Sequence, residues 1–259
     1  MSDARERYLR IQAELGGPEV VLSGNTARPP AGPPDRPEGS DAPTAKRDWR
    51  KDAPPIPGPG LTITSPASAD LLSGTSAFGS LDEIAKVVST CEKCALCSTR
   101  RKTVPGEGNP QARLMCVGEG PGETEDQTGR PFVGRAGELL TAMLAAIELP
   151  REEVFIANVV KCRPPQNRKP LPDEMEACLP YLRRQIQLIK PTVLLALGST
   201  AAEGLLSVKR SLGDLRLKVH RWDGIPLIVT YHPAALLRNP NWKKPAWDDV
   251  RIARQLLGD

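Results

Sequence analysis

Four cysteines form the clearest chemical pattern in this chain. Cys91 and Cys94 make a Cys-x2-Cys pair, and Cys162 and Cys178 follow far downstream. Four thiolates can hold either a tetrahedral zinc ion or a [4Fe–4S] cluster, and their spacing leaves both fillings open. The pattern indicates a metal centre that ties distant parts of the chain together.

Two further cysteines need a separate interpretation. Cys97 extends the pair to Cys-x2-Cys-x2-Cys, so it either competes as a ligand or is a small buried thiol. Cys116 lies in the apolar run RLMCVG and is expected to be a buried hydrophobic residue.

The segments between and after the cysteines contain glycine-rich and polar motifs. GEGPGETED (118–126) directly follows an apolar run, and its glycines allow the backbone to approach a ligand closely. It matches neither the Walker loop nor the dinucleotide fingerprint. Taken alone, the motif is more simply explained as an ordinary turn between a strand and a helix.

Two other motifs carry an aromatic ring and a histidine. GRPFVG (129–134) presents Phe132 in a chain with only 4% aromatic residues, either to stack on a flat base or to anchor the following helix. HPAALLRNP (232–240) begins with His232. Its Leu237 and Arg238 suit a loop that wedges into DNA and contacts a phosphate, unless the segment is a helical turn with leucines in the core.

The elements that must position these residues alternate along the chain. Strands are predicted at 113–118, 154–161, 193–198 and 226–231. Helices are predicted at 135–148, at 173–190 in two pieces because of Pro180, from Ser199, and near 246–257. This order predicts an α/β fold, a three-layer α/β/α sandwich with a central, mainly parallel four-stranded sheet. Ligands of such sheets bind at the carboxyl ends of the strands.

The chain divides into three expected regions. Residues 1–22 contain a short N-terminal helix at 5–15, and residues 23–79 form a disordered linker rich in Pro, Ala and Gly. The folded domain is expected at 80–259, and Ser80 is expected to cap its first helix.

Composition adds weak constraints. The formal net charge is +4, and it resides beyond residue 80, which is compatible with a polyanionic partner. No apolar run is long enough to cross a bilayer, and the charged N-terminus lacks a secretion signal. We therefore expect a cytoplasmic protein without a membrane partner, in a compartment where cysteines favour metal or redox chemistry over disulfides.

Three motifs together identify a family. GEGPGETEDQTGRPFVGRAG, NVVKCRPPQNRKPLPDE and YHPAALLRNP occur in this order, and over about 84–257 the chain resembles the family 4, iron–sulfur type of uracil-DNA glycosylase. The resemblance implies an enzyme of base-excision repair. It would flip uracil out of single- or double-stranded DNA and hydrolyse the N-glycosidic bond, leaving an abasic site.

The resemblance also implies a role for each motif residue. Cys91, Cys94, Cys162 and Cys178 match the ligands of a [4Fe–4S] cluster. A second group matches the uracil site: Glu119 as the catalytic polar residue, Gly120 as a backbone contact, Glu125 as a block against the thymine methyl, Phe132 as the stacking ring, Asn158 as the uracil reader, and His232 as the donor to uracil O2.

The chemistry of these side chains agrees with the implied roles. An Asn amide can donate to uracil O4 and accept from N3–H, whereas cytosine has the reverse pattern. A donor at His232 would stabilise charge that develops on O2, and Glu119 would orient the attacking water. The motifs contain no obvious Schiff-base lysine, which favours a monofunctional enzyme. The segment CRPPQNRKPLPDE lacks the histidine that a covalently trapping branch uses.

Two other functions remain open at this point. One is a non-enzymatic DNA- or partner-binding protein that uses the N-terminal extension as an interaction arm. The other is an electron-transfer iron–sulfur protein, although ferredoxin-like chains cluster their cysteines more tightly. The expected partner is uracil-containing DNA, with a further protein partner for the N-terminal extension, and the expected state is a monomer.

Overall fold

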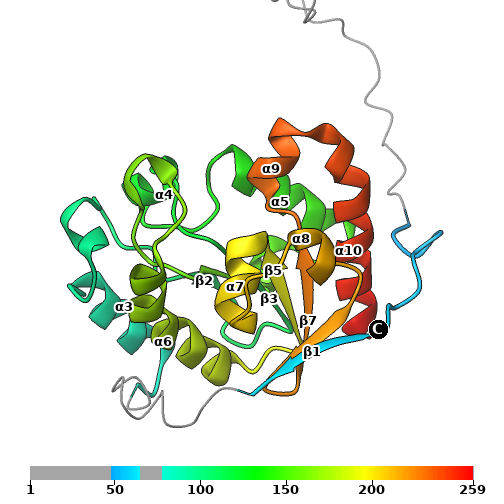
Figure 1. Cartoon of the computed structure of the whole chain (residues 1–259), viewed down its shortest axis with the longest axis horizontal. Helices are drawn as coiled ribbons and strands as arrows, with labels where there is room; N and C mark the ends of the chain where they lie inside the picture. Colours follow the sequence, from blue (N-terminus) through cyan, green and yellow to red (C-terminus); the bar gives the residue numbers. More distant parts are fainter. Residues whose placement is uncertain (1–47, 65–77, 259) are drawn as a thin grey trace, which may run out of the picture. The chain divides into compact units, whose positions relative to one another are not determined.

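The computed structural model describes residues 48–64 and 78–258. The helix expected at 5–15 lies outside these residues. A seven-stranded sheet of order β1-β6-β7-β5-β3-β4-β2 forms the centre of the described part (Figure 1). Its strands are β1 (Pro59–Ile63), β2 (Glu107–Gly108), β3 (Leu114–Gly118), β4 (Phe155–Asn158), β5 (Val193–Leu197), β6 (Val219–Trp222) and β7 (Ile225–Thr230).

The four strands predicted from the sequence are the parallel centre of this sheet. β7, β5, β3 and β4 lie side by side in that order, and all three pairings are parallel. The expected count of four is wrong, because β1, β6 and β2 extend the two edges. β6 pairs antiparallel with β7, and β2 antiparallel with β4. These three outer strands lack the apolar runs that reveal a buried strand in the sequence.

Eight α-helices and four short 3-10 turns complete the described residues. The α-helices are α3 (Leu81–Ser89), α4 (Glu123–Thr128), α5 (Arg135–Ala146), α6 (Pro172–Ile189), α7 (Ser199–Leu206), α8 (Leu212–Leu215), α9 (Pro233–Arg238) and α10 (Lys243–Leu256). The 3-10 turns are η2 (Ala95–Ser98), η3 (Arg151–Glu153), η4 (Pro165–Asn167) and η5 (Pro240–Trp242). None of the helices at 48–64 or 78–258 is long and apolar enough to cross a membrane.

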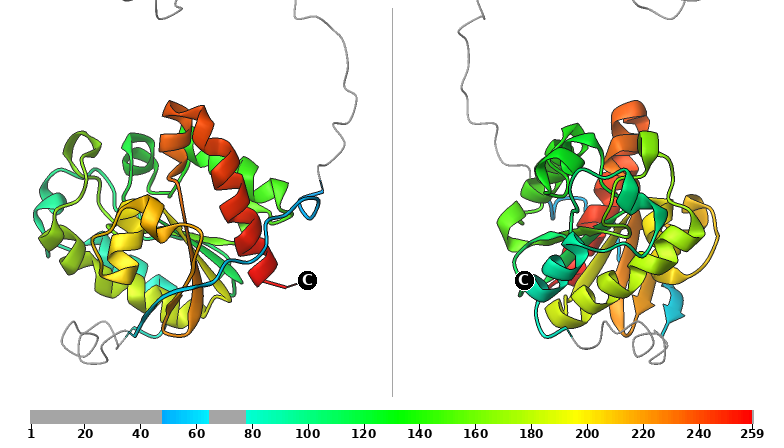
Figure 2. Two further views of the ribbon diagram at one scale, coloured as in Figure 1. Left: turned by 45° about the vertical axis from the view of Figure 1, so that its right-hand side comes forward. Right: turned by 90° about the vertical axis from the view of Figure 1, so that its left-hand side faces the viewer.

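Hydrophobic side chains fill both faces of the sheet. Along β3, Met115 packs into a cluster with residues of α3, α6 and α7. Cys116 points the other way, into a cluster with residues of α5 and α10, as predicted for a buried thiol. The alternation of side chains along each strand thus places helices on both faces, as the two views of Figure 2 show.

Helix α6 does not break at Pro180 as predicted. It runs from Pro172 to Ile189 as one helix with the proline inside. A proline in a helix interior costs about 3 kcal/mol. Met175 and Cys178 before it and Tyr181 and Leu182 after it are buried in the same hydrophobic cluster. Burial of both halves against one core outweighs the local preference.

The segment 48–64 is part of the folded domain, and the predicted disordered linker is wrong there. Trp49 is buried and donates from Nε1 to Glu148 (3.3 Å). The backbone N–H of Leu61 in β1 donates to Nδ1 of the buried His220 at 3.0 Å. The composition of this segment, rich in proline and glycine, is typical of disordered chain and gives no sign of order. Its few apolar residues become buried only through contacts with the folded domain. Phe78 and Gly79, at the end of the predicted linker, are ordered as well: the Phe78 carbonyl accepts a hydrogen bond from Arg184 at 2.7 Å, and the Gly79 N–H donates to Glu83 at 2.7 Å. The other linker residues lie outside the described ranges.

We predict that this segment stabilises the domain. A chain that begins at residue 78 should have a lower free energy of unfolding than a chain that begins at residue 48. The loss should be at least about 3 kcal/mol, the usual effect of removing one buried tryptophan. In the full chain, Trp49→Ala should lower stability by a similar amount. Urea unfolding followed by circular dichroism measures all three, and equal stability of the two truncated chains would contradict the assignment.

Candidate active site

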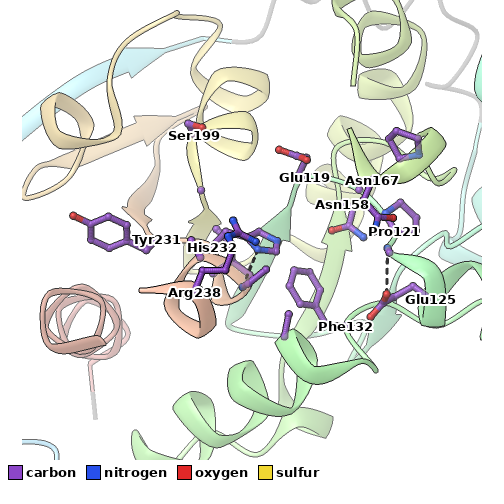
Figure 3. Close-up of a pocket in the computed structure, with 18 of the residues that line it drawn as sticks. Glu119, Pro121, Glu125, Phe132, Asn158, Asn167, Ser199, Tyr231, His232 and Arg238 are labelled. Atoms are coloured by element: carbon purple, nitrogen blue, oxygen red, sulfur yellow. Dashed lines mark hydrogen bonds between the residues drawn. The ribbon is translucent and has the colours of Figure 1, made fainter. Parts of the chain in front are cut away.

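A pocket of about 620 Å³ opens at the carboxyl ends of the four parallel strands. Figure 3 shows side chains from separate strands and loops arranged around it. Seven of the sequence-predicted site residues line this one pocket: Glu119, Gly120, Glu125, Phe132, Asn158, His232 and Arg238. Strand direction explains the convergence, because parallel strands end at the same edge of a sheet.

The loop after β3 carries Glu119 into the pocket. The backbone pairing between β3 and β4 continues into this loop, because the Val160 N–H donates to the Glu119 carbonyl at 3.1 Å. The Glu119 carboxylate accepts a hydrogen bond from the hydroxyl of Thr200, a buried residue in the first turn of α7. The carboxylate that could orient a water is therefore fixed from both its backbone and its side chain.

Asn158 ends β4 and has an unusual hydrogen-bonding state. Its side chain is buried, yet Oδ1 has no hydrogen-bond partner among the described residues. A buried acceptor left unpaired costs roughly 1–3 kcal/mol, and this one faces the pocket, where a ligand with a donor group would complete its bonding. Gly118 lies beneath it, and a side chain there would collide with both Asn158 and Phe132.

His232 begins α9 with a defined tautomer. Its Nδ1 accepts a hydrogen bond from the backbone N–H of Ala234 at 3.2 Å. The proton of the neutral ring therefore resides on Nε2, which is free to donate. Burial, reinforced by the charge of Arg238, lowers the pKa of His232 to about 4. The ring is thus a neutral donor at physiological pH.

Phe132 is held in a strained backbone conformation. Its φ of 51° lies in the left-handed region, which non-glycine residues rarely adopt. The ring is buried, with its centre 5.5 Å from that of His232. The following helix fits only because residue 137 is glycine, since a side chain there would collide with the Phe132 carbonyl. Strain of this kind persists where surrounding contacts over-determine the backbone.

The carboxylate of Glu125 supplies one set of these contacts. Oε1 accepts hydrogen bonds from the backbone N–H groups of Val133 and Gly134 at 2.9 and 3.0 Å. Oε2 accepts from the N–H of Gly122 at 3.1 Å. One side chain therefore joins the loop after β3 to the loop of Phe132.

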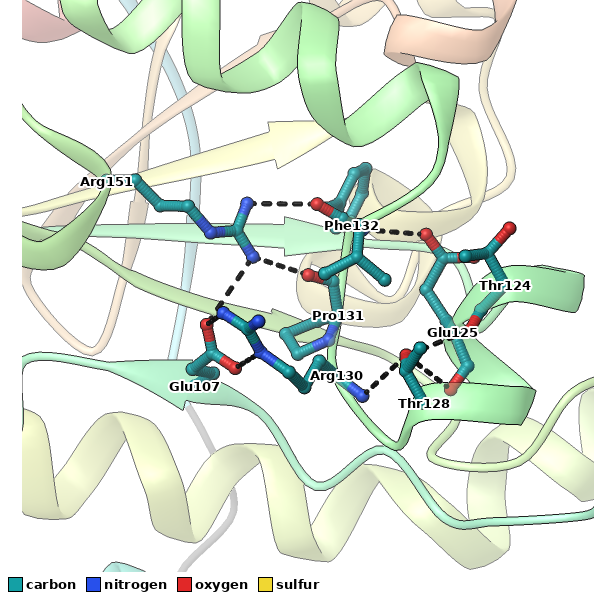
Figure 4. A network of polar contacts seen from close by, with 9 residues as sticks. Glu107, Thr124, Glu125, Thr128, Arg130, Pro131, Phe132 and Arg151 are labelled. Atoms are coloured by element: carbon teal, nitrogen blue, oxygen red, sulfur yellow. Dashed lines mark hydrogen bonds and ion pairs between the residues drawn. The ribbon is translucent and has the colours of Figure 1, made fainter.

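Arg151 supplies the contacts on the other side of the Phe132 loop (Figure 4). Its guanidinium donates to the carbonyl oxygens of Phe132 at 3.0 Å and Pro131 at 2.5 Å. Glu107 lies 3.8 Å from Arg151 and accepts two hydrogen bonds from Arg130. Two opposite charges, Glu125 and Arg151, thus grip the peptide groups on either side of the strained residue.

The segment after His232 is the helix α9, so the alternative of a helical turn is confirmed and the loop is wrong. Leu236 is buried in the core, and Leu237 points outward with 38% of its surface exposed. Leu237 is not among the residues that line the pocket, whereas Arg238 is. Their exposure at the pocket rim leaves both side chains accessible to a large ligand.

The four predicted metal ligands surround one small cavity. Cys91, Cys94, Cys162 and Cys178 line it, and Cys97 and Cys116 do not. Within residues 48–64 and 78–258, no three potential ligands already stand in metal-binding geometry. The donor set nevertheless fits a four-thiolate centre in its composition and common location.

Hydrogen-bond donors surround the sulfur atoms. Arg100 donates to Cys162 Sγ at 3.4 Å, and the Lys161 backbone N–H donates to Cys178 Sγ at 3.3 Å. Such contacts stabilise thiolate ligands. The Lys161 ammonium is buried and donates to the Asn158 carbonyl at 2.9 Å and to Gln185 at 2.7 Å. The same residue therefore contacts the cysteine cavity and the strand end that carries Asn158.

Several residues of the site carry no sequence signal. Arg151 lies in a short turn outside every motif, and Thr200 looks like an ordinary helix-start residue. Tyr231 begins the motif YHPAALLRNP but received no role from it, and Trp242 lies beyond that motif, yet both line the pocket. Gly118, by contrast, is the first glycine of GEGPG, and that motif could have revealed its role beneath Asn158 and Phe132.

The geometry can therefore hold and polarise a flat, neutral heterocycle. An aromatic ring, an unpaired amide acceptor and a neutral imidazole donor surround one space, with a fixed carboxylate at its edge. This combination suits recognition of a base and stabilisation of a developing anion.

Comparison with known proteins agrees with this geometry. The family model of the uracil DNA glycosylase superfamily matches residues 105–251. A type-4 uracil-DNA glycosylase of Sulfurisphaera tokodaii is 47% identical over 186 residues, 68% of this chain and 84% of the relative. One of Thermotoga maritima is 48% identical over 68% of this chain and 94% of the relative.

A more distant similarity covers less of the chain. A type-5 uracil-DNA glycosylase of Thermus thermophilus is 33% identical over 51% of this chain and 68% of the relative. The family match, together with the longer and stronger similarity to the type-4 proteins, places this sequence among them. The chain belongs to the uracil DNA glycosylase superfamily and, within it, to the type-4 uracil-DNA glycosylases.

Proposed function

We propose that this protein is a monofunctional uracil-DNA glycosylase that flips uracil out of DNA and hydrolyses its N-glycosidic bond, leaving an abasic site for base-excision repair. The unpaired Oδ1 of buried Asn158 is the observation that carries the proposal. Uracil N3–H supplies the missing donor, and the amide group donates to uracil O4. Cytosine has an unprotonated N3 and an amino group at C4, so with the amide in this orientation it would leave Oδ1 unpaired.

His232 and Glu119 act on the breaking bond. As the bond to the sugar lengthens, negative charge accumulates on uracil O2, and Nε2–H of neutral His232 donates to it. The sugar becomes cationic, and the Glu119 carboxylate offsets that charge and orients the attacking water. Thr200 keeps this carboxylate in place. The departing base is a tolerable anion, so a strong general acid is not required.

The remaining residues hold the base and the DNA. The Phe132 ring stacks on the flipped base, and the Gly120 backbone contacts it. Glu125 lies where it would exclude the thymine methyl, and it braces the Phe132 loop. Leu237 and Arg238 contact the strand at the rim as wedge and phosphate partner. The substrate is uracil-containing DNA, and we propose a monomer that acts in the cytoplasm.

Cys91, Cys94, Cys162 and Cys178 are the residues that would hold a [4Fe–4S] cluster. Bound there, the cluster would supply a structural link between the chain before β3 and the chain after β4. Their location away from the pocket residues favours this role over a part in bond cleavage.

The first prediction concerns the uracil reader. Asn158→Ala should lower the rate of uracil excision by about 10²–10³-fold, because the hydrogen bonds to the base are lost. An oligonucleotide with one uracil, followed by alkali cleavage, gives the rate. Visible absorption near about 400 nm checks that any cluster is retained, and binding to a strand with an abasic analogue checks the DNA contacts. Excision at the unchanged rate by the variant would remove Asn158 from recognition.

The second prediction concerns the protonation of His232. Since its pKa is lowered from 6.5 to about 4, the ring should remain neutral, with the proton on Nε2, at about pH 6. Nitrogen-15 NMR of the imidazole ring reports both its charge state and which nitrogen carries the proton. Between about pH 6.5 and 4 the unfolded chain binds a proton here that the folded chain does not, so folding stability should fall as the pH drops. His232→Gln should remove that part of the pH dependence. A ring that titrates near 6.5 would contradict the assignment.

The third prediction concerns the brace behind Phe132. Arg151→Met should lower kcat for excision by about tenfold or more, since hydrogen bonds from a charged group are each worth roughly 1.5–3 kcal/mol. Arg130→Met is the matched control, because Arg130 pairs with the same Glu107 without donating to a Phe132 or Pro131 carbonyl. If both variants lose the same activity, Arg151 acts only through general stability.

A further inference from the structure

An aromatic pair lies at the rim of the pocket, outside every role assigned so far. Tyr231 directly precedes His232, and Trp242 ends the turn η5. Their rings stack with centres 5.0 Å apart and planes 13° from parallel. Both residues line the pocket. The pair is therefore continuous with the space where the flipped base is proposed to bind.

Within this pair, Tyr231 is the ring that the surrounding structure holds in place. Its hydroxyl accepts a hydrogen bond from Arg216 at 3.2 Å, and the guanidinium carbon lies 4.4 Å from the ring centre. Arg216 is itself fixed by two hydrogen bonds to buried Asp249, at 2.7 and 3.0 Å. This anchoring holds Tyr231, and with it the ring that stacks on it.

Trp242 is different because much of it faces solvent. Its side chain is 39% exposed, although one side is covered by Tyr231. A single exposed apolar side chain is common and by itself indicates nothing. The surroundings of Trp242 make it informative: it is a flat ring on a fixed support, beside a pocket that is larger than one pyrimidine requires.

The charges around Trp242 indicate the kind of partner. Arg238, Lys243 and Lys244 are all exposed. Within residues 48–64 and 78–258, none of the three has an acidic partner in an ion pair. An aromatic ring among free cations is the usual composition of a surface that binds single-stranded nucleic acid, where bases stack and phosphates are neutralised.

We propose that Trp242, supported by Tyr231, is a stacking platform for an unpaired base that neighbours the flipped uracil on the same strand. The proposal rests on the proposed glycosylase function. Phe132 holds the uracil inside the pocket, and Trp242 holds the adjacent base at its rim, so two consecutive bases are removed from the DNA stack. The platform would favour single-stranded or locally opened DNA over an intact duplex.

The test is a double-mutant cycle in which the Trp242 ring and the base next to uracil are removed separately and together. The substrates are single-stranded oligonucleotides with one uracil, either intact or with a tetrahydrofuran abasic analogue replacing the base on the 5′ or the 3′ side. The proteins are the full-length wild type, Trp242→Ala and Trp242→Phe. Leu217→Ala is the control, because Leu217 is also apolar and exposed but lies outside the pocket lining. The readout is kcat/KM for excision.

With the intact strand, Trp242→Ala should lower kcat/KM about tenfold, as expected for one lost base stack, whereas Trp242→Phe should retain most of it. With one of the two neighbour-deleted strands, wild type should lose a similar factor and Trp242→Ala should lose nothing further. Leu217→Ala should match wild type throughout. An equal loss for Trp242→Ala on all three strands, or no loss on the intact strand, would overturn the platform.

A binding measurement separates the platform from the catalytic function. Fluorescence anisotropy gives the affinity for a strand with an abasic analogue at the uracil position, and this needs no excision. Trp242→Ala should bind this strand about tenfold more weakly than wild type, and unchanged binding would count against the platform. Wild-type protein that binds but excises no uracil would instead refute the proposed function. Thermal unfolding shows whether Trp242→Ala remains folded, and Trp242→Phe keeps the test decisive if it does not.

Discussion

The left-handed backbone at Phe132 is the constraint around which the rest of the pocket is arranged. An L-residue in this region costs roughly 1–3 kcal/mol, so the surrounding structure must hold it there. Glu125 binds the N–H groups just after Phe132, and Arg151 binds the carbonyl groups at and before it. The negative carboxylate of Glu125 thus holds N–H groups, and the positive guanidinium of Arg151 holds carbonyl groups, of the same short loop. Glu125 is positioned by α4 and Arg151 by η3.

The recognition groups show a similar balance between stability and readiness for a ligand. Asn158 keeps a buried acceptor unpaired, which costs free energy in the absence of ligand. His232 is half-buried, and the partial loss of solvent disfavours its charged form, while the bond to Ala234 selects the tautomer that donates from Nε2. An unpaired acceptor and a neutral donor fixed in this way would need little reorganisation to bind a neutral heterocycle.

The cysteine cavity and the pocket share a structural boundary. Cys162 follows β4 by a few residues, and Lys161 lies between it and Asn158. The buried ammonium of Lys161 donates to the backbone carbonyl of Asn158. It also donates to Gln185 on α6, the helix that carries Cys178. A four-cysteine centre at this place would fix the strand end that carries Asn158, so a group outside the pocket would contribute to the geometry of the pocket.

The sequence by itself determined the central part of this molecule. Four long apolar runs predicted the four parallel strands, and the residues that follow them predicted the site, because parallel strands must end at a common edge. The resemblance of three motifs named the family and seven of the residues that line the pocket. These signals are local, since each lies within a run or motif of about ten or twenty residues.

Only the tertiary structure decided the rest, because it depends on contacts between residues that are distant in the chain. β1 lies in a proline-rich segment that orders by pairing with β6, and Pro180 remains within a helix because both halves share one core. The grip of Arg151 on the Phe132 loop, the bond from Thr200 to Glu119 and the stack of Tyr231 with Trp242 have no local pattern. An arginine, a threonine or a tryptophan gains such a role only when the fold brings its partner within hydrogen-bonding or stacking distance.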